Sequence, residues 1–538
     1  MSGRELRGPA RLVSAAALGI RPQRLRHLPV VLTAVLCSLI AAFARWGPDW
    51  PAQEYRALLS STSVLSVWDN NWYGGTAMAG YSLVYPLISY VLGVAGTGVF
   101  AAVLCAFAAT RLPLRRRARD MAYGAAVSLT LAASLLIGQI PLLLGVGFGL
   151  AAVRKQRAGR LVAAGVLAAL CSLSSPLAGA FLLLVAVAFS AADSWRQLLP
   201  YAATVTGFLP ALLLGGASGP DPCPWGCVAG TLALAAGIVL LVPRDGSPTQ
   251  RVLYRFAGCY VAFGVLVFLV PNPIGGNLAR LGWLIALPLA CWLLPGLSRA
   301  RLPLGVLALA AALTWTLVPV VDSVGRGAGD PSRNLSYYSG LLGFLREQNP
   351  AAGRVEIPFT RDHWEARWVA PYFPLARGWE RQADFGYNSV LYRPLTAPVY
   401  RRWLYHNAVR WVALPDVALD PGGQAEGKLL RHPPDYLRPA WHDAHWRVWR
   451  VIGSPPIATG DAYVADLDTA SVTLVFRVAG ASTIHLHYSP LWHVVSGVGC
   501  ASATRSGWLR VTSPRRGRVV LSAGVNGNLL SGSASCTG

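Results

Sequence analysis

Residues 68–90 read WDNNWYGGTAMAGYSLVYPLISY, and they join a polar, aromatic segment to a strongly apolar one. The polar half carries a single acid, Asp69, among tryptophans, asparagines and glycines. Tyr85 and Pro86 then lead into the apolar half. A polar segment flanked by apolar runs predicts a loop at the face of a helical membrane bundle. An acid held there among aromatic and amide groups is a candidate catalytic base.

The composition of the whole chain agrees with a membrane bundle. Of its 538 residues, 54% are hydrophobic and only 13% are charged, whereas soluble domains have about a quarter charged residues. The polar residues are also unevenly placed, because eight of 24 acids and one of nine histidines precede residue 322. The sequence therefore predicts a long apolar part followed by a polar C-terminal part.

Apolar runs of membrane-spanning length predict eleven transmembrane helices between about Leu28 and Val321. Arginine-rich segments follow alternate helices, as expected for cytoplasmic loops. These segments are 111–119, 154–160, 193–197, 243–251 and 295–301. The pattern places the N-terminus in the cytoplasm and the C-terminal part outside. The helices are expected to turn outside at 138–141, 172–176, 219–227 and 271–280.

The predicted fold is thus a polytopic α-helical membrane protein with an extracytoplasmic C-terminal domain that is mixed α/β and then all-β. Strand-like segments such as RVEIPF and RWVALP alternate with helix-like ones in the first piece, and period-two segments such as SVTLVFRV and GRVVLSA fill the second. The expected divisions are a cytoplasmic arginine-rich N-terminus (1–28), a bundle (29–321) with its first external loop at 46–80, an external α/β domain (322–458) and a β-sandwich-like module (459–538).

The net charge of +23 does not indicate nucleic-acid binding, because the basic residues of the apolar part lie in short clusters between apolar runs. Most of the nine cysteines lie in apolar runs and are expected to be buried thiols. Cys223 and Cys227, and likewise Cys500 and Cys536, are placed so that an oxidising compartment would allow two disulfides.

Three acids of the apolar part, Asp49, Glu54 and Asp69, fall in the first external loop. A carboxylate in aromatic surroundings suits a general base that takes a proton from an acceptor hydroxyl. The alternative is that these acids are solvated loop residues beside interfacial tryptophans.

A second candidate site is GGNLARLGW, residues 275–283, where a helix re-enters the membrane from outside. Arg280 can bind a lipid phosphate in bidentate fashion, and Asn277 can hold a phosphate or sugar oxygen. The alternative for Arg280 is a side chain that extends along the membrane to place its charge at the interface.

A third candidate is LARGWERQADFGYN, residues 375–388, which mixes arginines, acids and tryptophan. This mixture suits either a saccharide-binding surface or an ion-pair network that ties the outer domain to the bundle. The residues expected to contact sugar or acceptor are Trp68, Asn70, Trp72, Tyr85, Arg377, Trp379, Glu380 and Arg381.

Motifs for other chemistries are absent from the sequence, since there is no P-loop and no HExxH. His442 with His445, and His485 with His487, are spaced like metal ligands but lack a convincing third ligand. No metal-ligating residue is assigned, and whether a divalent ion such as Mg²⁺ or Mn²⁺ takes part stays open.

The cytoplasmic N-terminus, the acid in the first external loop, the many helices and the external C-terminal domain resemble the GT-C superfamily of integral membrane glycosyltransferases. The WDNNWYGG and YSLVYPL segments are also similar to bacterial membrane proteins grouped as 6-pyruvoyl-tetrahydropterin-synthase-related, and the arginine richness with RGWERQ suggests an actinobacterial member. The resemblance implies a polyprenyl-phosphate sugar donor. It places the catalytic acid best at Asp69, with Asp49 or Glu54 next, although the loop lacks the superfamily's adjacent acid pair.

The leading hypothesis is an inverting extracytoplasmic glycosyltransferase of the bacterial plasma membrane, in which Asp69 deprotonates an acceptor hydroxyl. The donor's phosphate would lie near Arg280, and the acceptor would be a cell-envelope glycan or glycolipid. The rival hypotheses are a transporter or flippase of a lipid-linked precursor and a non-catalytic envelope scaffold. A transporter would carry ionisable residues deep inside its helices, and the apolar runs are nearly free of them.

Overall fold

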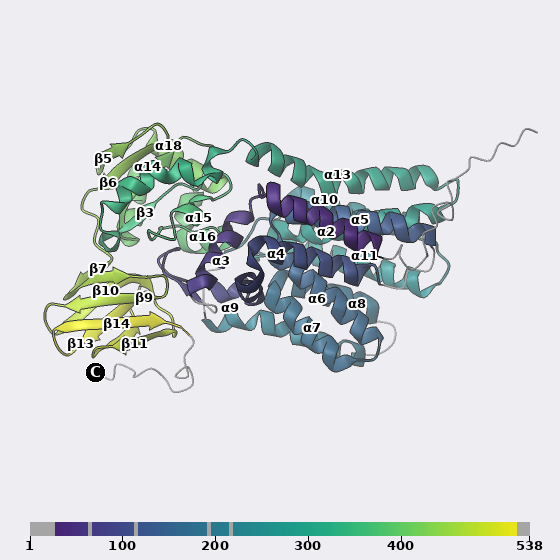
Figure 1. Ribbon diagram of the computed structural model, residues 1–538, viewed down its shortest axis with the longest axis horizontal. Coiled ribbons are helices and arrows are strands. Elements are labelled where there is room, and N and C mark those ends of the chain that lie inside the picture. Colours follow the sequence, from purple (N-terminus) through teal and green to yellow (C-terminus); the bar gives the residue numbers. More distant parts are fainter. Residues whose placement is uncertain (1–26, 63–66, 112–116, 191–194, 215–218, 525–538) are drawn as a thin grey trace, which may run out of the picture.

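The computed structural model describes residues 27–62, 67–111, 117–190, 195–214 and 219–524. Figure 1 shows a long helical bundle with two smaller units at one end, and these two units are called the outer part after the position that the sequence predicts for them. The bundle helices are α2 Leu28–Phe43, α4 Val84–Ala109, α5 Arg117–Ile137, α6 Ile140–Arg157, α7 Leu161–Ser174, α8 Pro176–Ser190, α10 Trp225–Leu241, α11 Pro248–Leu269, α12 Ala279–Leu293 and α13 Leu302–Gly327.

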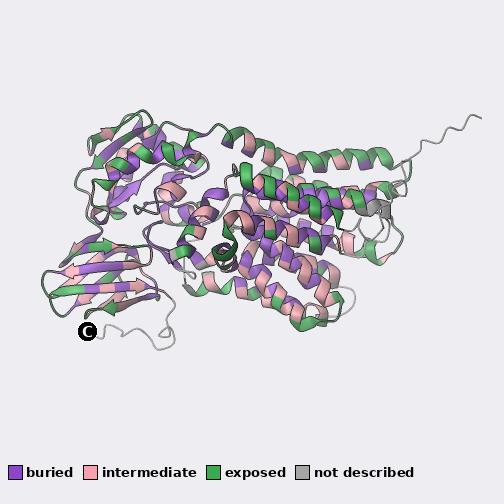
Figure 2. Cartoon of the chain, viewed as in Figure 1, coloured by how far each residue is buried: buried purple, intermediate pink, exposed green. Residues whose placement is uncertain are grey.

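Four helical segments of the described chain are long and apolar enough to cross a membrane, and five shorter apolar helices lie beside them. The four are Val84–Ala109, Pro248–Leu269, Gly275–Gly296 and Leu302–Gly327. Large apolar side chains cover the outside of the bundle, and Leu307 and Val321 on α13 are each about two-thirds exposed. Figure 2 shows α13 mostly exposed along its length, as suits a helix that faces lipid. The number of eleven crossings stays a prediction.

The seventh predicted crossing differs from the others. Where one long helix was expected, residues Leu199–Gly207 form a 3₁₀ helix and Leu209–Leu214 form the short helix α9. Proline and glycine interrupt this stretch, YAATVTGFLPALLL, and each weakens a continuous α-helix. The turns at 138–139 and at Ser175 confirm the two helical hairpins predicted there.

The outer part contains three sheets built from the predicted strands. The first has the order β3-β4-β6-β5, with β3 Arg354–Glu356 parallel to β4 Val409–Pro415 and with β6 Trp446–Val451 and β5 Leu437–His442 antiparallel. Its helices are α14 Leu335–Arg346, α15 Glu365–Trp368, α16 Arg381–Asn388, α17 Ala397–His406 and α18 Gln424–Leu430. Figure 1 shows α15 and α16 on the side that faces the bundle.

The last two sheets pack face to face around one apolar core. Their orders are β12-β13-β10-β7 and β11-β14-β9-β8. The strands are β7 Ala458–Gly460, β8 Ala462–Leu467, β9 Ser471–Phe476, β10 Gly480–His487, β11 Trp492–Ser496, β12 Cys500–Ala503, β13 Trp508–Ser513 and β14 Gly517–Ala523. Leu474 and Leu521 meet Ile484 and Val511 in that core, which is the inward-facing alternation of a β-sandwich.

The first external loop is folded between the bundle and the outer part. It contains the helix α3 Trp50–Thr62 and a hairpin of β1 Trp68–Asp69 and β2 Thr76–Ala77. The backbone of the hairpin bonds to the β-sandwich, where Asn70 N–H donates to Thr469 O at 2.7 Å and His487 N–H donates to Gly74 O at 2.8 Å. The loop that the sequence analysis began from is therefore an interior segment.

Candidate functional site

The three acids of the first external loop lie in three different environments. Asp69 has no exposed surface. Its Oδ2 accepts a hydrogen bond from the Tyr55 hydroxyl at 2.8 Å, and its Oδ1 accepts one from Asn71 N–H at 2.9 Å. Burial raises the pKa of Asp69 to about 7, against the lowering effect of these two donors. No part of the Asp69 side chain is accessible, and it lines neither the apolar cavity of the bundle nor the small cavity beside Arg56.

Glu54, in helix α3, lies in a cluster of ion pairs. One carboxylate oxygen is 3.3 Å from Arg45 Nη1, and the other is 3.3 Å from Arg367 Nε on α15. Both oxygens therefore have a cationic partner, and one of these partners belongs to the outer domain. This arrangement ties the outer domain to the loop and leaves little of the carboxylate for a substrate.

Asp49 is the acid that meets the predicted phosphate-binding arginine. Asp49 Oδ2 is 3.1 Å from Arg280 Nη1, and Arg280 at the start of α12 retains 22% of its side-chain surface exposed. The backbone holds Asp49 in place, since its N–H donates to Ile137 O at 3.1 Å. A Cβ on Gly138, which has φ +95°, would lie 2.7 Å from Trp50 N, so the α5–α6 turn needs glycine for this approach.

The outer domain reaches Asp49 through Trp379. The Trp379 indole Nε1 donates to Pro48 O at 3.0 Å, and the Trp379 carbonyl oxygen lies 2.8 Å from His363 Nδ1. Trp379 also packs edge-on against Tyr81, with ring centroids 6.1 Å apart. The predicted sugar-binding tryptophan therefore lies beside the Asp49–Arg280 pair.

A second contact from the bundle comes from the loop before α10. Asn277 Nδ2 donates to Asp221 Oδ2 at 3.3 Å, and Gly219 N–H donates to Gln382 O of α16 at 2.7 Å. The pKa of Asp221 is raised by burial, and the charges of Arg381 and Arg280 oppose that shift. Asn277 is thus held by a neighbouring acid near the arginines, where the sequence predicted a phosphate or sugar ligand.

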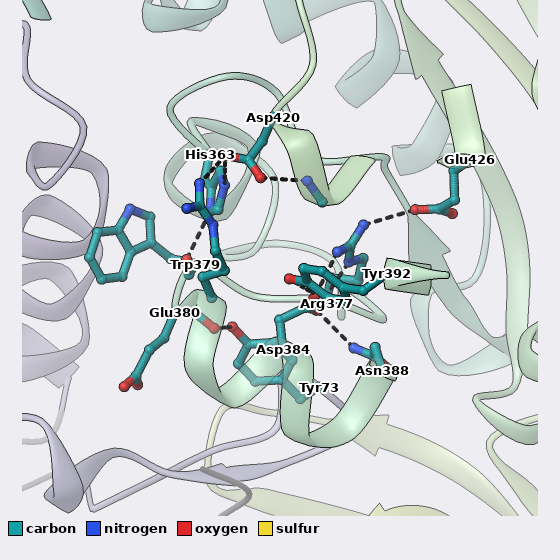
Figure 3. A network of polar contacts seen from close by, with 12 residues as sticks. Tyr73, His363, Arg377, Trp379, Glu380, Asp384, Asn388, Tyr392, Asp420 and Glu426 are labelled. Carbon is teal, nitrogen blue, oxygen red and sulfur yellow. Dashed lines mark hydrogen bonds and ion pairs between the residues drawn. The ribbon is translucent and has the colours of Figure 1, made fainter. Parts of the chain in front are cut away.

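Arg377 is buried in an ion-pair network and does not lie at the surface, where a sugar-binding residue was predicted. It is 2% exposed, and its guanidinium binds Asp384 Oδ1 at 3.0 Å and Glu426 Oε2 at 2.8 Å. Figure 3 shows this network inside the outer domain, with Tyr392 and Asn388 also on Asp384. The ion pairs of Arg377 thus lie within the outer domain, whereas the predicted network was to tie that domain to the bundle.

Arg381 and Glu380 flank that network on its accessible side. Arg381 pairs with Asp420 and is half exposed. Figure 3 shows the Glu380 side chain extending away from Arg377 and Asp384, while its backbone oxygen accepts from the Tyr73 hydroxyl at 2.7 Å. Only these two side chains and Trp379 remain of the outer-domain residues predicted to contact a sugar.

Three loop residues predicted to contact sugar are also corrected by the structure. Trp68 Nε1 donates to Asn70 Oδ1 at 2.8 Å, and Asn70 Nδ2 donates to Asp468 O at 2.8 Å. The Tyr85 hydroxyl donates to Gln53 O at 2.8 Å. All three side chains are buried and bonded within the protein, so they hold the loop against the sandwich and the bundle.

Two cavities adjoin this junction. The larger, of about 480 Å³, is lined by apolar side chains of α4, α5, α6, α8, α11 and α12, and it reaches Leu281, the residue after Arg280. The smaller, of about 20 Å³, is bordered by Arg56 of α3, Trp72, Tyr81, Trp379 and Glu380. Sequence reasoning did not single out Arg56 as a site residue. Its signal was available, since Arg56 and Arg280 are exceptions in external loops otherwise poor in arginine.

The described residues contain no group of three His, Cys, Asp or Glu side chains that could hold a metal ion. Cys223 and Cys227 are free thiols, so the disulfide considered between them is not formed. Cys500 is disulfide-bonded, and Cys536, which the sequence suggests as its partner, lies outside the described residues.

No family model and no curated protein matches the chain. Solved structures do match it at low identity. The arabinofuranosyltransferase AftD from Mycobacteria is 12% identical with a TM-score of 0.41, over 94% of this chain and 58% of AftD. The archaeal oligosaccharyltransferase AglB from Archaeoglobus fulgidus is 13% identical (TM-score 0.38, 73% of this chain and 69% of AglB). ArnT from Cupriavidus metallidurans is 14% identical (TM-score 0.37, 82% and 99%).

Two of the matched proteins are named as transferases of sugars, AftD as an arabinofuranosyltransferase and AglB as an oligosaccharyltransferase. This chain spans less than two-thirds of the length of AftD. The AglB structure contains a dolichol-phosphate, and a second ArnT structure was solved bound to undecaprenyl phosphate.

Proposed function

We propose that this protein is an extracytoplasmic GT-C glycosyltransferase in which Asp49 is the general base and Arg280 binds the phosphate of a polyprenyl-phosphate sugar. The observation that carries the proposal is the Asp49–Arg280 ion pair of 3.1 Å at the junction of bundle and outer domain. Asp49 is itself only 5% exposed, so its pairing with Arg280, and not its exposure, favours it over Asp69 in this role.

The reaction needs one base and one anion-binding group. Asp49 would take the proton of an acceptor hydroxyl as that oxygen forms a bond to the anomeric carbon of the donor sugar. The bond from the anomeric carbon to the phosphate oxygen breaks from the opposite side, and this displacement inverts the anomeric configuration. The phosphate leaves as an anion without taking up a proton, and Arg280 stabilises its charge.

Arg280 has enough donors for both partners. Its guanidinium carries five N–H groups, and Asp49 uses Nη1. An arriving phosphate can bind the remaining N–H groups and compete with Asp49 for the shared one. This exchange would release the Asp49 carboxylate from Arg280 and leave it free to take the proton of the acceptor hydroxyl.

The apolar cavity suits the lipid of such a donor. It ends at Leu281 beside Arg280 and extends between α5, α6, α8, α11 and α12 to Arg157 and Pro248 at the other end of the bundle. A polyprenyl chain buried there gains hydrophobic free energy in proportion to its apolar surface. The headgroup would then emerge next to Arg280 and Trp379.

The placement of charge supports one-sided chemistry over transport. In the described bundle helices, most Asp, Glu, Lys and Arg side chains lie near helix ends, as with Arg280 at the start of α12 and Arg154 at the end of α6. Arg255 of α11 is the exception, because it lies two turns into its helix. A transport pathway would need such groups at membrane depth. The proposal keeps the N-terminus in the cytoplasm and residues 322–538 outside, with a cell-envelope glycan or glycolipid as acceptor.

The test is sugar transfer in membranes from a panel of labelled polyprenyl-phosphate sugars. We expect Asp49→Asn to lower transfer about 10²- to 10⁴-fold, the usual contribution of a general base. Glu54→Gln and Asp69→Asn, two acids of the same loop, are the matched controls and should retain transfer. Full transfer by a folded Asp49→Asn protein would overturn the assignment. Loss of transfer in Asp69→Asn alone would return the base to Asp69.

A further inference from the structure

Two side chains that border the small cavity between α3 and the start of α16 each carry a buried N–H group without a hydrogen-bond partner among the described residues. Arg56 is 4% exposed. Its Nη2 donates to Ser82 O at 2.7 Å and to Met78 O at 3.2 Å, whereas its Nη1 is buried and unbonded. The Trp72 indole Nε1 is likewise buried and unbonded. Buried donors are normally bonded, so each of these two N–H groups calls for a ligand.

The third group that borders the cavity is an acceptor. Glu380 borders it, and within the part of the chain that the structure describes its carboxylate makes no hydrogen bond and no ion pair, Arg56 included. Burial raises the pKa of Glu380, and the charge of Arg56 opposes that shift. The buried Arg56 cation and the half-buried Glu380 carboxyl group therefore border the same small space without touching.

The combination selects one kind of chemical group. A hydroxyl accepts two hydrogen bonds and donates one, which matches two donors, Arg56 and Trp72, and one acceptor, Glu380. A phosphate or carboxylate would be repelled by the carboxylate of Glu380. The cavity volume of about 20 Å³ accommodates an oxygen the size of one water molecule.

We propose that this cavity is a subsite for a single hydroxyl group of a saccharide bound at the Asp49–Arg280 site, an inference that rests on the proposed glycosyltransferase function. The connection is short. Trp379 borders the cavity, and its indole donates to Pro48 O, one residue before Asp49. Tyr81 borders it too, packed edge-on against Trp379. A sugar ring lying on Trp379 would insert one hydroxyl between Arg56 and Glu380, which makes the cavity a specificity determinant.

The experiment compares binding of methyl glycosides of mannose, galactose and arabinose with binding of each of their mono-deoxy forms. Full-length protein in detergent is used, and dissociation constants are measured by titration calorimetry. In the wild type we expect removal of one particular hydroxyl to weaken binding roughly 5- to 150-fold, the range for leaving buried polar groups unpaired. Removal of the other hydroxyls should have smaller effects.

The variants connect that hydroxyl to the cavity. Trp72→Phe removes one donor and should reduce the penalty of the sensitive deoxy position to about 2-fold, as in a double-mutant cycle. Trp364→Phe is the matched control, because its buried indole N–H is also unbonded but does not border the cavity. Glu380→Met, at a half-buried position, repeats the test if Trp72→Phe does not fold.

Two results would overturn the inference. One is that no glycoside binds. The other is that every deoxy form loses the same factor in the wild type and in the Trp72 and Glu380 variants, which would mean that the cavity holds a resident water only. The proposed function fails separately, if no polyprenyl-phosphate donor supports transfer while glycoside binding still depends on Trp72.

Discussion

The buried carboxyl group of Asp69 makes stability depend on pH in a direction that can be worked out. Burial raises its pKa from an ordinary 3.8 to about 7. Between these values the folded protein binds a proton that the unfolded chain has released. The stabilisation is therefore complete below pH 3.8 and is lost as pH rises through 7. At 1.36 kcal/mol per unit of pKa, a shift of about three units amounts to about 4 kcal/mol.

The perturbation is Asp69→Asn, which keeps the shape of the side chain and removes its titration. Unfolding of full-length protein in detergent would be followed by tryptophan fluorescence at pH values from 4.5 to 8. We expect the wild type to lose about 3 kcal/mol more than the variant across this range, because the window from 4.5 to 7 spans about two and a half units. The variant should be the more stable protein at pH 8.

Glu54→Gln is the control, since Glu54 belongs to the same loop but has two arginine partners. It should leave the pH dependence of the wild type in place. Parallel stability curves for the wild type and Asp69→Asn would refute the reasoning, because the curves must diverge if Asp69 changes its protonation on unfolding. Sugar transfer by the same variant separates a structural Asp69 from a catalytic one, since transfer is expected to survive the substitution.

Three further predictions concern other parts of the chain. Arg377→Met should destabilise the protein by about 3–5 kcal/mol in chemical denaturation, because it leaves Asp384 buried without its cation, whereas the half-exposed Arg381→Met should cost less than about 1 kcal/mol. Cys227→Ser should leave the reductant dependence of thermal stability the same as in the wild type, because Cys227 is a free thiol. Leu284→Trp, inside the apolar cavity, should raise the KM for a polyprenyl-phosphate donor with little change in kcat; an unchanged KM would place the lipid elsewhere.

Much of the fold follows from local sequence patterns. The helix Leu28–Phe43 has the bounds expected from its apolar run, and strands such as Val409–Pro415 and Ser471–Phe476 lie where period-two or apolar runs predict them. The stretch 199–214 shows the limit of this approach. Its apolar content matches a membrane helix, but its prolines and glycine divide it into two short helices. The mean hydropathy of a segment does not show where a proline or glycine interrupts it.

The candidate site was predicted as a set of residues but not as an arrangement. Asp49, Glu54 and Asp69 are similar in sequence, all being acids in one aromatic loop. In the structure they separate into a buried acid paired with one arginine, a half-buried acid paired with two arginines and an enclosed acid hydrogen-bonded to Tyr55 and Asn71. Asp69 was preferred as the base, but its side chain is inaccessible. Its neighbours Trp68 and Asn70 pack against the β-sandwich and enclose it.

The sequence by itself determined the class of this protein: a long apolar part with arginine-rich segments on one side, a polar α/β and β part after it, and a loop rich in acids and aromatics between them. These features are carried by runs of adjacent residues, because the affinity of a side chain for water or lipid depends on that side chain alone. Only the tertiary structure decided which acid is available. Asp49 meets Arg280 and Glu54 meets Arg367 across hundreds of positions, and burial of Asp69 comes from packing between distant segments. Pairing and burial arise from contacts that sequence separation does not reveal.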